Sequence, residues 1–165
     1  MRFVLDGMLG RVALWLRLTG HDTLYYPDAD DDRLIDVAQE EDRVLLTSDA
    51  ALEERARDRV AGVMLVRGDV DEQVTSVFKR FQIEPRIDPS RSRCSKCNGE
   101  LEEIHGEDKS RIRALLHEKT YDHYDIFWLC KTCNSVFFQG AQWKNITDYM
   151  DRIKARIGSQ EQQIT

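Results

Sequence analysis

The fold is indicated first by residues 3–20, which read FVLDGMLGRVALWLRLTG. The apolar run 3–5 is typical of a buried strand, and it ends at Asp6. Apolar residues then recur at helical spacing over residues 8–19, and Gly20 is typical of a helix end. A strand that passes directly into an amphipathic helix is typical of a parallel sheet.

The same alternation of strand and helix repeats up to residue 83. Further strands are predicted over 23–26, 43–47 and 63–66. One helix is predicted to start within the aspartate run 28–32, and a second to lie around Leu52 and Ala56. A third is predicted from Asp69, which with Glu72 resembles a capping box. This order predicts an α/β fold, a parallel sheet covered by helices on both faces.

Changes in composition divide the chain. Residues 1–83 form the α/β domain, and 84–93, which hold two prolines and little to bury, form a linker. All the cysteines lie within 94–140, the predicted second domain. Residues 141–158 have the apolar spacing of a helix that packs back on a domain, and 159–165 are expected to be a disordered tail.

The cysteines form two CxxC motifs, Cys94 with Cys97 and Cys130 with Cys133. In a cytosolic chain such pairs indicate metal ligands rather than disulfides. Four thiolates give a closed tetrahedral zinc site, which is structural because no coordination position stays open. The motifs are 32 residues apart, so a charged insert over 106–113 is expected between the ribbon strands. The alternative ligands are the histidines at 105, 117 and 123.

Aspartates follow three of the predicted strands. Asp6 ends the first strand, the run 28–32 follows the second, and Asp49 follows the third. Ligands bind beyond the carboxyl ends of parallel strands, and clustered carboxylates suit Mg²⁺ or Mn²⁺. Such an ion supports phosphodiester hydrolysis. The alternative for each aspartate is a helix cap, which this residue type also favours.

The charge distribution restricts how the chain could hold a nucleic acid. Residues 1–90 carry a net charge of −7 and residues 91–165 a net charge of +1. Bulk electrostatic binding to phosphates needs a basic protein, so an RNA partner requires cations, a few placed arginines or another protein. No apolar run reaches the length of a membrane span, and Asp6 precedes any signal-peptide core, so a cytoplasmic location is expected.

Several segments together resemble a known family. They are 3–11 (FVLDGMLGR), 15–20 (WLRLTG), 44–52 (VLLTSDAAL), the two CxxC motifs and 137–143 (FFQGAQW). In this order they resemble the PIN-like RNase family named for the C-terminal domain of the Mut-seven exonucleases. The resemblance covers nearly the whole chain except its tail.

The resemblance implies a PIN-like sheet, RNase activity on RNA and an attached zinc ribbon. It places the catalytic, Mg²⁺- or Mn²⁺-binding acidic centre at Asp6, Asp31 and Asp49, with Asp30 and Asp32 as alternatives to Asp31. Two positions depart from the family pattern. Ser48 stands where an arginine is usual, and Gln142 stands where a histidine is usual.

Three residues are predicted to bind RNA. Arg11 lies about one turn after Asp6, and Trp143 and Lys144 offer a stacking face and a cation. The prediction is a metal-dependent ribonuclease whose zinc ribbon aids RNA binding. The main alternative is a non-catalytic adaptor for RNA or protein, and a phosphotransfer receiver domain ranks last. Endo- or exonuclease action, a protein partner and a homo-oligomer stay open.

Overall fold

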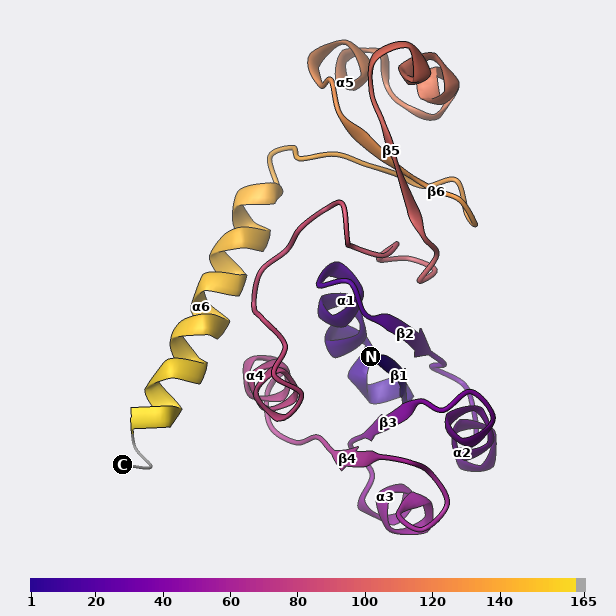
Figure 1. Cartoon of the computed structure of the whole chain (residues 1–165), viewed down its shortest axis with the longest axis vertical. Coiled ribbons are helices and arrows are strands. Elements are labelled where there is room, and N and C mark those ends of the chain that lie inside the picture. The colour runs from indigo at the N-terminus through magenta and orange to yellow at the C-terminus, as the bar shows by residue number, and fades with distance from the viewer. Residues whose placement is uncertain (163–165) are drawn as a thin grey trace.

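The computed structural model describes residues 1–162 of the 165-residue chain. Its first part alternates strands with helices (Figure 1). In chain order the elements are β1 (Arg2–Leu5), η1 (Gly7–Leu9), α1 (Gly10–Leu18), β2 (Asp22–Tyr25), α2 (Asp31–Glu40), β3 (Val44–Thr47), α3 (Ala50–Ala56), β4 (Val63–Leu65) and α4 (Val70–Arg80).

The four strands form one parallel sheet in the order β2-β1-β3-β4. The connection from β1 leads outward to β2, whereas the next connection returns past β1 to β3. The strand order therefore switches between β1 and β3, which is where ligands bind in open sheets of this kind. Asp6 and Ser48 directly follow these two strands.

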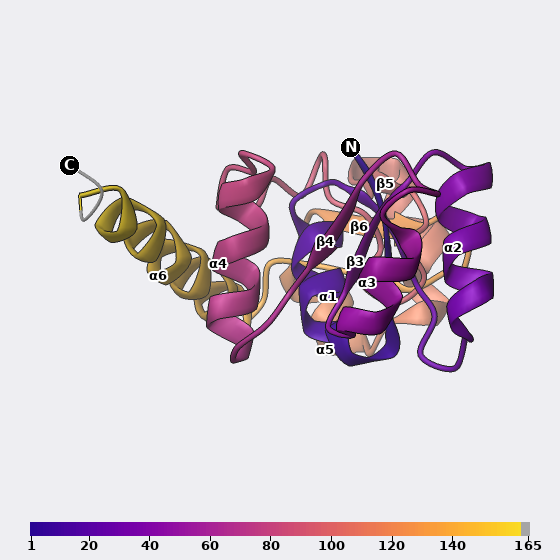
Figure 2. The same ribbon diagram turned by 90° about the horizontal axis from the view of Figure 1, so that it is seen from below.

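Helices cover both faces of the sheet, as predicted (Figure 2). On one face α1 and α4 bury an apolar cluster that includes Phe3, Leu16 and Phe78. On the other face α2 and α3 bury a second cluster, which includes Leu34 and Leu45. Strand residues alternate between the two clusters, because successive side chains of a strand point to opposite faces.

The predicted boundaries agree closely with these elements. The capping box of Asp69 and Glu72 is present at the start of α4. The predicted helix over 8–19 begins instead with the 3₁₀ turn η1, because Asp6 caps that turn and α1 begins only at Gly10.

The second part of the chain is a small antiparallel sheet that follows the segment 84–93. It contains β5 (Leu101–Ile104), β6 (Phe127–Cys130) and β7 (Val136–Phe137), in that order. The insert between β5 and β6 holds the 3₁₀ segment η2 (Gly106–Leu115) and α5 (Glu118–His123). The buried apolar cluster of this second domain consists of Ile104, Ile112 and Phe127. So small a core needs a further stabilising element, such as a bound metal ion.

The last helix, α6 (Trp143–Gln162), lies along the outside of α4 (Figures 1 and 2). Met150 and Ile153 join the buried cluster under α1 and α4, and Tyr149 stacks on Trp15 with ring centroids 4.1 Å apart. Asp71 of α4 pairs with Arg152 and Arg156 of α6.

The helix continues past residue 158, where the disordered tail was expected to begin. Residues 159–162 are helical, and 163–165 lie outside the described residues. None of the helices among the described residues is both long enough and apolar enough to cross a membrane.

Candidate functional sites at the two edges of the sheet

Asp6 lies at the carboxyl edge of the sheet, where the strand order switches. Its side chain is only 8% exposed. One carboxylate oxygen, Oδ1, accepts a hydrogen bond from the Met8 amide (3.0 Å). The other, Oδ2, accepts from the Ser48 amide (2.9 Å) and from the Thr47 hydroxyl. All these donors are neutral, and among the described ion pairs none involves Asp6.

Thr47 links the ends of the two central strands. Its buried hydroxyl donates to Asp6 and accepts from the Asp49 amide at 3.0 Å. Sequence reasoning did not single out Thr47, although its place at the end of the strand before Ser48 and Asp49 is a usable signal. The hydroxyl fixes the Asp6 carboxylate relative to the turn that carries Asp49.

Asp49 is exposed and caps α3. Its Oδ1 accepts from the amides of Ala51 (2.7 Å) and Leu52 (3.3 Å). The cap orients the carboxylate, and a carboxylate has lone pairs left beyond two such bonds.

The aspartate run after β2 has divided roles. Asp30 caps α2 by accepting from the Arg33 amide at 2.8 Å. Asp31 and Asp32 both pair with Arg55 of α3, Asp31 at 2.9 Å. The structure therefore turns the Asp31 carboxylate toward α3.

Close backbone packing brings the loop after β2 against Asp6. A Cβ at Gly7 would lie 2.5 Å from the carbonyl oxygen of Pro27, so only glycine fits. The Tyr25 hydroxyl donates to the Gly7 carbonyl at 2.9 Å. These contacts fix the loop that leads into the aspartate run beside the end of β1.

The four cysteines form the one group of three or more potential metal ligands in residues 1–162 whose ligand atoms all lie within 4.8 Å of one another. Asp6, Asp31 and Asp49 thus do not form so close a group. The Cys94 and Cys133 sulfurs are 3.7 Å apart, and those of Cys97 and Cys130 are 3.4 Å apart. Zinc–sulfur bonds of about 2.3 Å in a tetrahedron place sulfurs roughly 3.8 Å apart, so these four could hold a zinc ion.

The electrostatics around the first CxxC motif also fit a cation. Burial raises the pKa of the Cys94 thiol to about 12, so a thiolate there needs a positive charge nearby. Arg17 supplies part of that charge through space. The ion would supply the rest, and its binding energy would be folding energy for the small domain.

Arg17 fastens this motif to the amino-terminal edge of the large sheet. The side chain is 8% exposed, and Nε donates to the Thr23 carbonyl at 3.0 Å. One terminal nitrogen, Nη1, donates to the carbonyls of Ser95 (3.1 Å) and Lys96 (3.5 Å), the two residues between Cys94 and Cys97. Arg17 therefore has a structural role that its sequence position did not reveal.

Asn98 completes the junction with Asp22 and Arg43. The Asn98 amide oxygen accepts from the Thr23 amide at 2.8 Å, and its nitrogen donates to Asp22 at 2.7 Å. Asp22 also pairs at 2.9 Å with Arg43, whose side chain is 4% exposed. Burial alone raises the pKa of Asp22, but the hydrogen bonds from Arg43 and Asn98 outweigh it and lower the pKa to about 2.

The predicted RNA-binding residues come from two helices: Arg11 from α1, and the adjacent Trp143 and Lys144 from the start of α6. Arg11 is exposed on α1. Burial raises the pKa of the Tyr149 hydroxyl of α6, and the positive charge of Arg11 lowers it by a smaller amount. Lys144 is exposed and pairs with Asp148 one turn later at 2.6 Å. Trp143 is half-buried and lines a groove of about 100 Å³ with Trp128 and Phe137.

A doubly covered parallel sheet with a carboxylate at its switch point, joined to a four-cysteine ribbon, defines a PIN-like domain with an attached zinc ribbon. The model of one family, the Mut7-C RNase domain, matches residues 1–150. The chain belongs to this family, which confirms the resemblance seen in the sequence. No match was found among curated proteins or among solved structures.

Proposed function

We propose that the chain is a metal-dependent ribonuclease that hydrolyses RNA phosphodiester bonds at the carboxyl edge of its parallel sheet. The match to an RNase-domain family supports the reaction class. The observation that carries the site is Asp6. It is a buried carboxylate at the switch point, held by neutral donors alone.

A buried charge without a countercharge is costly unless a cation binds to it. Asp6 is held in place by Thr47, Ser48 and Met8, yet its negative charge is not neutralised by them. A carboxylate has about four lone-pair positions, and three are used here. Asp6 therefore has both the charge and the capacity to bind a divalent ion.

Asp49 and Asp31 complete the proposed Mg²⁺ or Mn²⁺ site. Carboxylate oxygens are the ligands that such hard ions prefer. A bound ion polarises a phosphate oxygen and lowers the pKa of a water molecule for attack. The role of Thr47 is to hold the Asp6 carboxylate in a fixed orientation. Asp31 joins the site only if its pairing with Arg55 is broken.

RNA contacts are proposed for Arg11, Trp143 and Lys144. Arg11 would bind a phosphate, and Trp143 and Lys144 would extend the binding surface along the start of α6, next to the zinc ribbon. Ser48 offers no cation at the position where the family has arginine, so the chain depends on such secondary contacts for phosphate binding.

The test is cleavage of labelled single-stranded and hairpin RNAs by the zinc-loaded chain, with Mn²⁺ and without it. We expect Asp6→Asn and Asp49→Asn to lower the rate on the order of 100-fold or more, because each removes charge stabilisation in the transition state. Asp28→Asn is the matched control, since Asp28 lies at the same edge but outside the proposed set. Its rate should match the wild type.

Comparing Asp30→Asn, Asp31→Asn and Asp32→Asn assigns the ligand in the aspartate run. Zinc content and circular dichroism show whether each variant is folded. A wild-type chain that is folded and zinc-loaded but cleaves no RNA with Mn²⁺ would contradict the proposal. It would favour the alternative, a non-catalytic adaptor for RNA or protein.

A further inference from the structure

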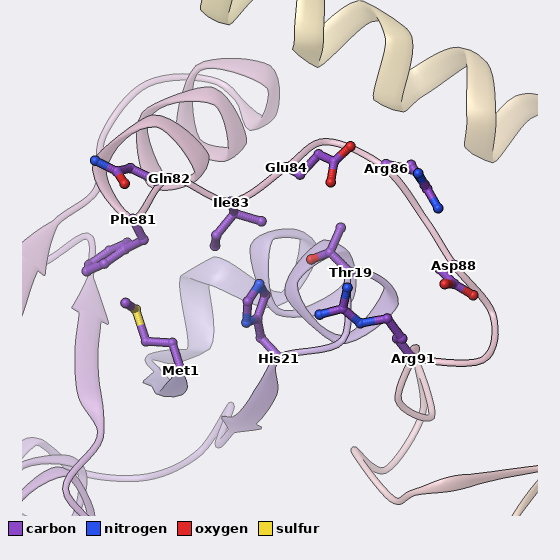
Figure 3. A pocket seen from close by; sticks show the side chains of 10 residues that line it. All are labelled: Met1, Thr19, His21, Phe81, Gln82, Ile83, Glu84, Arg86, Asp88 and Arg91. Atoms are coloured by element: carbon purple, nitrogen blue, oxygen red, sulfur yellow. The ribbon is translucent and has the colours of Figure 1, made fainter.

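A pocket of about 440 Å³ lies at the amino-terminal edge of the large sheet, opposite the edge that holds Asp6 and Asp49 (Figure 3). Its floor is the turn between α1 and β2, which holds Thr19 and His21, and its outer wall is the segment 82–91. This volume is within the range of about 300–1,000 Å³ that is usual for small-molecule sites.

The outer wall is fixed rather than loose. The Ser92 hydroxyl donates to the Leu18 carbonyl at 2.6 Å, and the Arg93 amide donates to the Arg17 carbonyl at 2.9 Å. A Cβ at Gly20, whose φ is +93°, would lie 2.9 Å from the Arg91 carbonyl oxygen, so the two backbones are in close contact. The segment predicted as a linker thus forms a preformed wall, which lowers the entropic cost of binding.

Two arginines give the pocket donors for an anion. Arg86 and Arg91 both line it, and in Figure 3 the Arg91 side chain reaches toward His21. The ion pairs of the described residues involve neither arginine. Both acidic residues there, Asp88 and Glu84, carry charges that oppose an anion, and Asp88 is held by the Ser90 amide (3.0 Å) and hydroxyl (2.6 Å). The N-terminal amine, whose charge also acts on His21, adds a third positive charge, so the positive charges outnumber the negative ones by three to two.

The pKa of His21 reflects its burial and the positive charges around the pocket. Burial lowers its pKa to about 4, together with the positive charges of the N-terminal amine and Arg91. The ring is therefore neutral near pH 7 and offers one N–H donor. Its edge-on contact with Phe3, with centroids 5.9 Å apart, holds the ring at the pocket floor.

The remaining wall is apolar and is formed by Met1, Phe81 and Ile83. An anion that fits both surfaces has a compact charged group and a flat or apolar body. Arginine pairs bind phosphate in a bidentate manner, and an aromatic wall suits a base.

We infer that this pocket binds a phosphate monoester attached to a nucleoside, with Arg86 and Arg91 holding the phosphate and the Met1–Phe81–Ile83 wall contacting the base. This site is separate from the proposed cleavage site, and the inference does not depend on cleavage. The same chemistry is presented by a free mononucleotide and by the 5′-phosphorylated end of an RNA.

Calorimetric titration of the full, zinc-loaded chain tests this without added Mg²⁺ or Mn²⁺. The probes are AMP and a 5′-phosphorylated tetranucleotide, compared with adenosine and the 5′-hydroxyl tetranucleotide. We expect binding of the phosphorylated probes only. The double variant Arg86→Gln/Arg91→Gln should weaken it by about tenfold or more, since charge-assisted hydrogen bonds to phosphate are lost. Arg113→Gln, which removes one positive charge from the ribbon insert, should leave binding unchanged.

Glu84→Gln should tighten binding a few-fold, because it removes one of the two negative charges in the pocket. Amide chemical-shift changes at residues 19–21 locate the bound probe. Pocket-dependent binding of AMP supports the inference with a free nucleotide as the source. Pocket-dependent binding of the phosphorylated RNA alone supports it with an RNA end as the source. The inference is overturned if no probe binds, if adenosine binds as well as AMP, or if the arginine variant, folded and zinc-loaded, binds normally.

Discussion

The two edges of the parallel sheet each present an aspartate at one end of a strand, Asp6 buried and Asp22 half-buried, but in different electrostatic surroundings. Asp22, at the amino-terminal edge, is neutralised by Arg43 and further bound by Arg2 and Asn98. Asp6, at the carboxyl edge, accepts only from neutral donors. The two aspartates thus differ in their capacity to bind a cation. A neutralised carboxylate fixes structure, whereas one held by neutral donors can still attract a cation.

The two edges of the sheet also differ in how their potential metal ligands are held. The four-cysteine ribbon is docked at the amino-terminal edge through backbone carbonyls and buried side chains. The carboxyl edge has Asp49 exposed and Asp31 turned toward Arg55, so its carboxylates are not pulled tightly together. We interpret the first edge as a structural junction and the second as the reactive one.

The largest expected effect is that of Cys130→Ser on the junction. Apart from the cysteines, the buried apolar cluster of the ribbon consists of Ile104, Ile112 and Phe127, so zinc has to supply much of the folding energy of this domain. The binding free energy of structural zinc in small peptides is about 10–16 kcal/mol. We expect loss of bound zinc and loss of hydrogen-exchange protection over 94–140. Strands β1 and β3 should stay protected. Full zinc content with unchanged thermal unfolding would show that the ligand assignment is wrong.

Arg17→Met should have the next largest effect, because it leaves the Thr23 and Ser95 carbonyls without their donor in a buried junction. We expect a loss of about 2–4 kcal/mol in the free energy of unfolding, measured by urea titration. Arg11→Met on the same helix is the control. Arg11 is exposed, so a change within about 0.5 kcal/mol is expected. Equal losses in the two variants would show that the junction does not stabilise the fold.

Much of the architecture follows from patterns within the sequence. The alternation of apolar runs predicted the sheet and its helices, because strand and helix periods are local properties of the chain. The cysteine spacing likewise indicated a metal cluster, which the four neighbouring sulfurs match. The sequence indicated the carboxyl edge of the sheet, and the strand order adds that the switch point lies beside Asp6.

Tertiary contacts were not accessible in the same way. Arg17 and Asn98 meet across 80 positions of sequence around Thr23, and nothing local marks either residue as buried. The pairing of Asp31 with Arg55 also depends on how α2 and α3 pack. Position in the chain could suggest which carboxylates end strands, but not which cations they would meet.

Acid should reduce the stabilisation that the ionised Asp22 carboxylate gives to the folded chain. Its pKa is lowered to about 2 in the folded chain, so the unfolded chain takes up the proton more readily as the pH falls. The stabilisation is therefore complete above about pH 4 and is lost between about pH 4 and pH 2. The Asp22 side chain is 26% exposed, so we expect about 1–2 kcal/mol rather than the full value of the shift.

Urea titrations of wild type and Asp22→Asn from pH 6 to pH 3 measure this effect. The difference in the free energy of unfolding between the two chains should shrink as the pH falls, and loss of zinc, which affects both, is removed by taking that difference. A difference that stays constant down to pH 3 would show that the Asp22 charge does not stabilise the junction.

The smallest expected effect on stability is that of Arg55→Gln, which tests the carboxyl edge. The Arg55 side chain is 46% exposed, and exposed ion pairs contribute about 0–1 kcal/mol, so unfolding should hardly change. Mn²⁺ affinity should rise a few-fold, because Asp31 and Asp32 lose the cation that competes for their charge. Arg59→Gln, which breaks the nearby pair with Asp36, is the matched control for a charge change. Equal Mn²⁺ affinity in the two variants would show that Arg55 does not compete with an ion for Asp31 and Asp32, which would contradict Asp31 as a ligand.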